Sequence, residues 1–286
     1  MTALAIAAAL GEMAPIDLAE LIERAALQTR VDRKYVVPLT ALPSLLSQLP
    51  AGTRVLDIDA DRSFRYESIY FDTPWLASYH CAAYRRRRRF KVRTRTYLDS
   101  GDCWLEVKIN GARDSITKHR LRYLSQDRST VGPGREFVDE VLSREAIPAD
   151  GDFAPTLVTS YRRSTLLLPA TTSQRFSRVT IDTELRWRCG SASLTLPQVA
   201  VVETKSSAAA AAADRLLWRG GIRPMRISKY ATGLAALRPD LPDGPWRRTL
   251  RRHFCGIPAP SDRPSGPATH LTPTVVRHIE QEASCV

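Results

Sequence analysis

Residues 89–108 alternate charged and apolar side chains over two successive stretches, and this alternation constrains the fold more than any other feature of the sequence. From Arg89 to Tyr97, basic side chains alternate with apolar side chains and threonines, which is the period-two pattern of a half-buried strand. The stretch from Cys103 to Ile109 repeats the pattern after a polar turn, so the sequence predicts an antiparallel hairpin. Because like charges on one strand face repel, the basic face indicates a multivalent anion as its ligand.

Other parts of the chain show the same two-sided character. In addition to the hairpin, strands are predicted at residues 29–37, 67–72, 116–123, 157–168, 175–187 and 198–205. Helices are predicted at residues 17–28, 39–49, 75–84, 136–144, 208–218 and 227–237. We therefore expect an α+β fold in which most strands have one charged face and one apolar face.

The acidic residues bear on how such strands pack together. A sandwich would leave the charge outside, whereas a sheet that closes on itself would place the charge inside and the helices outside. Acids recur within the basic rows, as suits a polar interior that holds an anion and a divalent metal ion. These acids are Asp32, Glu106, Asp182, Glu184 and Glu203. We therefore predict an eight-stranded antiparallel β tunnel with helices packed outside.

The composition bears on partners and on the cellular compartment. Lysine and arginine total 42 against 30 aspartates and glutamates, a formal charge of +12, which favours an acidic partner. The five cysteines are scattered without a Cys-x-x-Cys pair, which fits a reducing compartment and argues against disulfides and thiolate zinc sites. Residues 1–10 lack a basic flank, and no run approaches the roughly 18 apolar residues of a membrane span. We expect a cytoplasmic protein without a transmembrane segment.

A run of five arginines occupies residues 85–89. Such a run is typical of nucleic-acid binding or of a solvated loop that leads into the next strand. The acids within the basic rows, and the lack of exposed stacking aromatics near the run, argue against nucleic acid. We therefore expect no nucleic-acid partner.

A series of short segments, in order along the chain, resembles the triphosphate tunnel metalloenzymes of the CYTH-like superfamily. Within them it resembles the polyphosphate polymerase domain of the vacuolar transporter chaperone (VTC) complex and its bacterial relatives. The matching segments are Asp32–Tyr35, Ser68–Asp72, Lys91–Arg95, Leu105–Lys108, Lys118–Arg120, Tyr161–Arg163, Arg178–Thr183, Val202–Lys205 and Ser228–Tyr230. The resemblance implies an antiparallel tunnel, a triphosphate-type ligand held by lysine and arginine, and Mn²⁺ or Mg²⁺ held by a glutamate.

The same resemblance divides the chain into three parts. Residues 1–28 form a predicted N-terminal helical segment, residues 29–238 the VTC-like tunnel domain, and residues 239–286 a Pro/Arg-rich tail that is predicted to be flexible.

Site residues follow from the resemblance together with the chemistry of phosphate binding. Catalytic roles are predicted for Lys34, Arg93, Arg95, Lys108 and Glu203. Phosphate binding is predicted for Lys34, Arg93, Arg95, Lys108, Lys118, Arg120, Tyr161, Arg163, Arg178, Lys205 and Lys229. Glu203 is the predicted metal ligand, because its carboxylate supplies the hard oxygen that Mg²⁺ and Mn²⁺ prefer. Glu106, Asp182 and Glu184 are secondary metal candidates and are predicted mainly to be ion-pair partners that orient the basic residues.

The predicted first tunnel strand departs from the family pattern. Tunnel enzymes generally begin with a Glu-x-Glu-x-Lys strand, whereas this chain has Arg30, Asp32 and Lys34 at the corresponding positions. An arginine at position 30 resembles the polymerase-like branch. The leading hypothesis is therefore a polyphosphate polymerase that transfers the γ-phosphoryl group of ATP to a polyphosphate chain. The alternatives are a triphosphatase that hydrolyses tripolyphosphate or a nucleoside triphosphate, and a non-catalytic polyphosphate-binding module.

Overall fold

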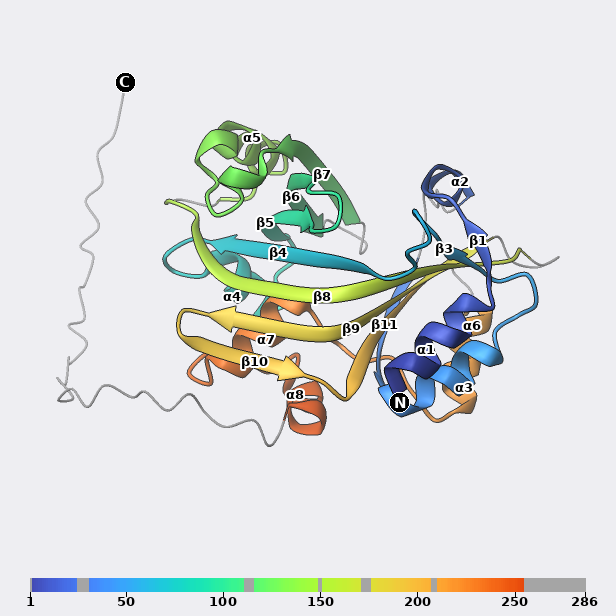
Figure 1. The fold of residues 1–286 in the computed structure, drawn as a ribbon. Helices are drawn as coiled ribbons and strands as arrows, with labels where there is room; N and C mark the ends of the chain where they lie inside the picture. The colour runs from blue at the N-terminus through green and yellow to red at the C-terminus, as the bar shows by residue number, and fades with distance from the viewer. Residues whose placement is uncertain are drawn as a thin grey trace, which may run out of the picture.

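The computed structural model describes residues 2–24, 31–110, 116–148, 151–170, 176–206 and 210–254, and one large antiparallel sheet dominates it (Figure 1). The strands are β1 Ala14–Ile16, β2 Val31–Pro38, β3 Arg54–Leu56, β4 Phe64–Asp72, β5 Arg89–Tyr97, β6 Cys103–Asn110, β7 Ile116–Tyr123, β8 Ala154–Leu168, β9 Ser177–Cys189, β10 Ala192–Leu196 and β11 Val199–Ser206. The α-helices are α1 Thr2–Gly11, α2 Leu18–Arg24, α3 Leu42–Ser47, α4 Ala77–Ala83, α5 Arg135–Arg144, α6 Ala212–Arg219, α7 Lys229–Leu237 and α8 Arg247–His253. The predicted α+β class and each predicted strand are confirmed.

Eight strands form one antiparallel path in the order β2-β11-β9-β8-β4-β5-β6-β7. Three short strands, β1, β3 and β10, lie off this path and were not predicted. Among the described strands no pairing joins β2 to β7, so the sheet is open where the sequence predicted a closed tunnel. The outer edge of β2 is partly occupied by the chain that leads into α7, because the Met225 amide donates to the Lys34 carbonyl at 2.8 Å.

The apolar face of the sheet is covered by helices, as predicted. Residues such as Tyr35, Val179 and Val202 pack against α1, α3 and α6, which lie together in Figure 1. Val92, Leu105 and other apolar side chains of β4 to β6 pack against α5 in a second cluster. The period-two alternation explains this arrangement, because each of these residues lies one position away from a residue on the charged face.

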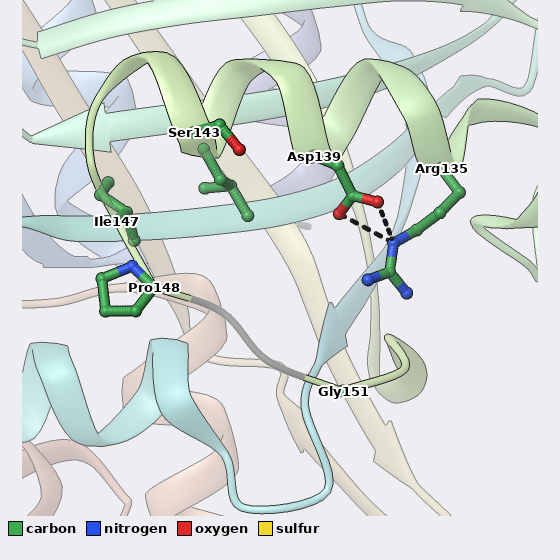
Figure 2. Close-up of a pocket in the computed structure, with 7 residues that line it drawn as sticks. Arg135, Asp139, Ser143, Ile147, Pro148 and Gly151 are labelled. Atoms are coloured by element: carbon green, nitrogen blue, oxygen red, sulfur yellow. Dashed lines mark hydrogen bonds and ion pairs between the residues drawn. The ribbon is translucent and has the colours of Figure 1, made fainter.

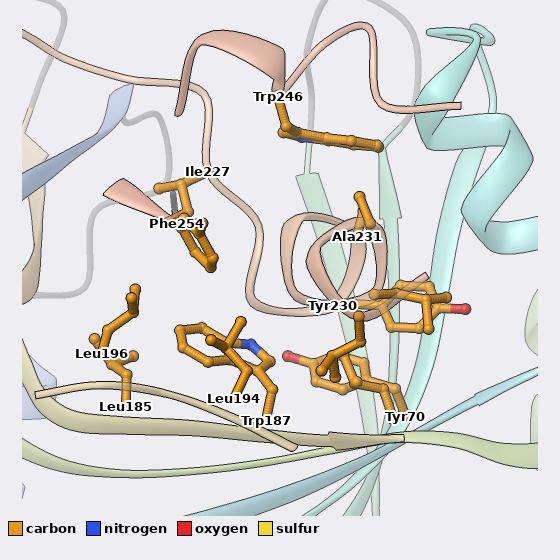
Figure 3. Close-up of a cluster of buried hydrophobic side chains, with 14 of the residues drawn as sticks. Tyr70, Leu185, Trp187, Leu194, Leu196, Ile227, Tyr230, Ala231, Trp246 and Phe254 are labelled. Carbon is orange, nitrogen blue, oxygen red and sulfur yellow. The ribbon is translucent and has the colours of Figure 1, made fainter. Parts of the chain in front are cut away.

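Helix α7 lies on the charged side of the sheet, which the sequence did not predict. Its residues Tyr230, Ala231 and Leu234 pack against strand side chains that share a face with the charged rows, including Tyr70 and Trp187 (Figure 3). The Trp187 indole also donates to the Lys229 carbonyl at 2.8 Å. The prediction that all helices pack outside the sheet is therefore wrong for α7.

A β-bulge brings Trp187 onto that face. The pairing between β8 and β9 shifts register between Ser160 and Arg162, and Glu184 has a positive φ of 53° at this point. The extra residue reverses the alternation, so Leu185 and Trp187 follow Asp182 onto the inner side. The prediction that Glu184 belongs to the charged row is wrong for this reason, and its side chain is exposed.

The chain after α7 packs back onto this cluster. The Trp246 ring lies 5.8 Å from the ring of Tyr79 on α4, and Phe254 lies 5.8 Å from Trp187. Residues 239–254, which the sequence placed in a flexible tail, are thus a packed segment that contains α8. The rest of the predicted tail, 255–286, and Arg30 lie outside the described residues. No helix in the part of the chain that the structure describes has the length and apolar character needed to cross a membrane.

Gly233 tests the packing of α7 against the sheet. A Cβ at this position would overlap the Trp187 ring, so Gly233→Ala should lower the free energy of unfolding by about 1–3 kcal/mol. Gly244→Ala is the matched control, because a Cβ there meets nothing within 4 Å. Urea unfolding of both variants measures the difference. Equal stability of the two variants would contradict the contact between α7 and β9.

Candidate functional site

All lysines of the chain lie in one place. They are Lys34, Lys91, Lys108, Lys118 and Lys205 on the inner face of the sheet and Lys229 at the start of α7. Arg93, Arg95, Arg163 and Arg178 lie among them on the same face. We call the whole set the cationic face: Lys34, Lys91, Arg93, Arg95, Lys108, Lys118, Arg163, Arg178, Lys205 and Lys229. Outside this region the basic side chains that carry permanent positive charge are arginines, so all lysine ammonium groups lie in this region.

Glu106 on β6 holds one end of the cationic face. Its carboxylate accepts from Arg93 at 2.7 and 2.9 Å and contacts the Lys118 ammonium. Burial acts to raise the pKa of Glu106, but the charges of Arg93, Arg95 and Lys118 outweigh it and lower this pKa. Glu106 on β6 is therefore an anion that orders three cations from the two strands beside it, Arg93 and Arg95 on β5 and Lys118 on β7.

Asp182 on β9 holds the middle of the face. Its two oxygens accept from Arg163 at 2.6 and 2.8 Å, and the Lys229 ammonium contacts one of them. Burial again opposes ionisation, yet Arg163 and Lys229 lower the pKa of Asp182. The Lys229 ammonium also lies 4.3 Å from the centre of the Tyr161 ring, which places the start of α7 against the sheet.

Asp32 and Glu203 form the third group, on the adjacent strands β2 and β11. Lys205 contacts both carboxylates, at 2.9 Å from Asp32, and Lys34 lies 3.3 Å from Glu203. Against the effect of burial, Lys34 and Lys205 hold the pKa of Glu203 well below its usual range. Two carboxylates thus bind one shared cation between the strands.

This carboxylate pair is the best fit for a divalent metal ion. Among the described residues no three histidines, cysteines or acids form a metal-binding group, so the protein offers no all-protein cage. Mg²⁺ and Mn²⁺ commonly take one or two carboxylates and complete their shell with substrate phosphates and water. The donor set of Asp32 and Glu203 fits that pattern, and the predicted ligand Glu203 lies in it.

Two lysines of the face form no ion pair with a carboxylate of the described structure. Lys91 is half-buried and donates to the Ser228 hydroxyl at 2.9 Å. Burial lowers the pKa of Lys91 to about 7, helped by the charges of Lys108 and Lys34. Burial together with Lys34 likewise lowers the pKa of Lys108 to about 8. The face therefore has more positive charge than its own carboxylates balance.

Several polar side-chain atoms on this face are buried without a hydrogen-bond partner among the described residues. They include the Tyr161 hydroxyl, the Arg95 Nε and the hydroxyls of Ser68, Thr159 and Thr180. Ser68 pairs with Arg95 on one side and with Thr159 on the other, so three of them form one row across β5, β4 and β8. Leaving a buried polar group unpaired costs about 1–3 kcal/mol. A polar ligand on the cationic face would supply these missing partners.

Most of the predicted site residues are brought together here. Lys34, Arg93, Arg95, Lys108, Lys118, Tyr161, Arg163, Arg178, Glu203, Lys205 and Lys229 all lie on the face. Arg120 does not join the ion pairs, because its guanidinium lies 5.1 Å over the Trp104 ring on the exposed edge of the sheet. Lys91 and Ser228 were missed as site residues. The two-residue spacing from Arg93 placed Lys91 on the basic face, but its burial beneath Ser228 depends on the position of α7.

The arginine run at residues 85–89 lies away from these ion pairs. Tyr84 and Arg85 to Arg88 are exposed, and the Tyr84 side chain is 58% accessible beside the stacked His80 ring. Trp75, before α4, is 83% accessible. The expectation that no exposed aromatic residue lies near the run is therefore wrong, because Tyr84, the residue that follows α4, is exposed to solvent.

A pocket of about 380 Å³ lies beside α5, apart from the cationic face (Figure 2). Arg135 lines it and donates to both oxygens of Asp139 at 2.9 and 2.8 Å. Because Asp139 neutralises this guanidinium, the pocket has no excess charge with which to bind an anion. It is a weaker candidate than the cationic face.

Comparison with protein families identifies the fold to which this face belongs. A family model of the VTC domain matches residues 29–238, which is more than half of the chain. The chain belongs to the VTC domain family. The matched range of this VTC domain contains the entire cationic face and ends one residue after α7. A search of curated proteins found no match.

Solved structures similar to this VTC domain share little sequence with it. A candidate adenylate cyclase from Vibrio parahaemolyticus is 13% identical with a TM-score of 0.42, over 73% of this chain and 98% of that chain. A candidate adenylyl cyclase from Hippeastrum, reported to have a dominant triphosphatase activity, is 13% identical with a TM-score of 0.39, over 71% and 94%. A conserved protein from Pyrococcus furiosus is 13% identical with a TM-score of 0.36, over 68% and 88%.

The lowered pKa of Lys91 predicts how the stability of the ligand-free protein depends on pH. The pKa of this lysine is about 7 in the folded state and 10.5 at its ordinary value. Between these values the unfolded state binds more protons, so the free energy of unfolding should rise with pH, by at most about 1.4 kcal/mol per pH unit for one lysine. Lys91→Met should reduce the slope measured by urea unfolding, whereas Arg86→Met on the exposed loop should not. Identical slopes in both variants would contradict a buried, destabilised ammonium.

Proposed function

We propose that this VTC domain is a metal-dependent polyphosphate polymerase, which transfers the γ-phosphoryl group of ATP to a polyphosphate chain held on the cationic face. The observation that carries the proposal is the state of the carboxylates. Glu106, Asp182 and Glu203 are each paired with cations, and each has a lowered pKa. They are therefore poor proton acceptors.

This property separates two reactions that the same face would serve. Hydrolysis of a triphosphate requires a water molecule to lose a proton, which a general base with a pKa near the operating pH promotes. The terminal phosphate of a polyphosphate chain is already an anion at neutral pH and needs no such base. In polymerisation its oxygen bonds to the γ-phosphorus, the bond from that phosphorus to the bridging oxygen breaks, and ADP leaves with the electron pair. A site without a basic carboxylate favours polymerisation.

Lys91 is the group that would favour hydrolysis, because an amine with a pKa of about 7 can accept a proton near neutral pH. Bound phosphates oppose this role, since nearby negative charge stabilises the ammonium and raises its pKa. In the complex Lys91 then acts as a positive charge, like the other lysines of the face.

The cations have complementary roles in this proposal. Arg93 and Arg95 are two residues apart on β5, and their forked guanidinium groups suit the equatorial oxygens of the transferred group. Lys34 and Lys108 add point charges near the carboxylate pair. The two lysines lie close enough together for the charge of Lys34 to lower the pKa of Lys108. The remaining predicted phosphate ligands hold the chain: Lys118, Tyr161, Arg163, Arg178, Lys205 and Lys229. Arg120 is left out of the proposed set because of its position over Trp104.

Glu203, with Asp32 beside it, would hold Mn²⁺ or Mg²⁺. Such an ion would supply positive charge that neutralises the charge developing on the leaving group. Lys205, which contacts both carboxylates, would then turn toward the phosphates.

The product of ATP turnover distinguishes the proposed reaction from its alternatives. With ATP and Mn²⁺, the protein should form polyphosphate, which gel electrophoresis separates from free phosphate. Glu203→Gln, which removes one charge at nearly constant volume, should lower turnover about a hundredfold while leaving the thermal unfolding midpoint near that of the wild type. Free phosphate as the main product would favour the triphosphatase. Binding of tripolyphosphate without turnover would favour the binding module.

Arg93→Lys and Arg95→Lys test whether guanidinium geometry matters on the face. Each change keeps the charge but removes the fork that pairs with two phosphoryl oxygens, so turnover should fall about tenfold or more. Arg86→Lys and Arg87→Lys on the exposed loop are the matched controls and should have little effect. Similar small losses in both pairs, at equal ionic strength, would mean that β5 contributes only net positive charge.

A further inference from the structure

A basic pocket lies on α6, on the side of the sheet opposite the cationic face. It has a volume of about 420 Å³ and is lined by Arg215, Trp218, Arg219 and Arg223. Helix α6 packs its Leu216 against the apolar outer cluster, so the sheet separates this pocket from the proposed polymerase site. The volume is within the range of about 300–1,000 Å³ that is typical of small-molecule sites.

The pocket carries positive charge that its own lining does not neutralise. No acid is among the described residues that line it. The Arg215 guanidinium donates to the Ala210 carbonyl at 2.6 Å, while Arg219 and Arg223 are exposed and pair with no acid in the described chain. Arg215 and Arg219 are one helical turn apart, so their like charges repel on the same side of α6. An anion in the pocket would relieve this repulsion.

The indole of Trp218 gives the pocket an aromatic wall in a fixed position. Its Nε1 donates to the Tyr35 hydroxyl at 3.1 Å, and Tyr35 donates in turn to the buried Asp214 at 2.6 Å. The Thr204 hydroxyl also donates to Asp214 at 2.6 Å, which fastens α6 to β11. Since the only polar atom of the indole is already bonded, the half-exposed ring offers the pocket an apolar surface for stacking.

We infer that this pocket binds a nucleoside di- or triphosphate, with its phosphates on the arginines and its base against Trp218. A bare phosphate chain would use the arginines but would gain nothing from the ring, whereas a nucleotide uses both. Stacking of a base on an aromatic side chain is commonly strong enough to change affinity tenfold or more. The site is separate from the nucleotide position that the polymerase reaction requires, because it lies on the other side of the sheet.

Calorimetric titration with ADP tests the inference, with the Arg93→Ala/Arg95→Ala variant as the parent protein because its cationic face is weakened. ADP should bind this parent once per chain, and pyrophosphate should bind at least about tenfold more weakly. In the same parent, Arg219→Ala/Arg223→Ala should weaken ADP binding at least about tenfold, and Trp218→Leu should remove the advantage of ADP over pyrophosphate. Arg186→Ala/Arg188→Ala on β9 is the control with the same change in charge, and it should bind ADP like the parent.

Other outcomes would overturn the inference. Absence of ADP binding to the parent, or equal losses in the α6 and β9 variants, would reduce the pocket to general surface charge. Equal affinity for ADP and pyrophosphate would exclude a nucleotide as the preferred ligand. The readout is binding and not turnover, so the result is independent of whether the polymerase proposal holds.

Discussion

Repulsion between cations on one sheet face is the constraint on which the rest of this structure depends. Six lysines and several arginines share the inner side of the sheet. Four carboxylates form ion pairs with these cations: Asp32, Glu106, Asp182 and Glu203. The balance is incomplete, since burial next to other cations lowers the pKa values of Lys91 and Lys108. A folded state with uncompensated buried charge is stabilised by any multivalent anion that binds it.

The fold holds these charges by using the two sides of the strands for different purposes. Apolar side chains on the outer side pack against α1, α3, α5 and α6, and this packing supplies the hydrophobic stabilisation that offsets the inner repulsion. On the inner side, α7 covers part of the face and brings Ser228 and Lys229 to it. Asp214 connects the two sides, because it accepts hydrogen bonds from Tyr35 and Thr204. Tyr35 follows Lys34 in the sequence, and Thr204 lies between Glu203 and Lys205.

Sequence periodicity predicted this arrangement wherever the alternation was regular. The hairpin of β5 and β6, the common side of Arg93 and Arg95, and the position of Glu203 beside Lys205 all follow from a period of two. The prediction failed where a single residue changed the register or where a distant element intervened. Glu184 left the charged row because of a bulge, and Lys91 became partly covered by Ser228 at the start of α7. Neither event has a local sequence pattern, since each depends on contacts between segments far apart in the chain.

The central claim is that the cationic face binds a phosphate chain, and acylation of lysine amines tests it most directly because every lysine of the chain lies there. The protein would be given a brief pulse of an amine-reactive ester at about pH 8, followed by peptide mass spectrometry. At this pH the amine of Lys91, with a pKa of about 7, is largely uncharged, and that of Lys108, with a pKa of about 8, is about half uncharged. The account predicts that tripolyphosphate protects the lysines of the face, while sulfate at equal ionic strength protects them far less. Equal acylation with tripolyphosphate and with sulfate would contradict it.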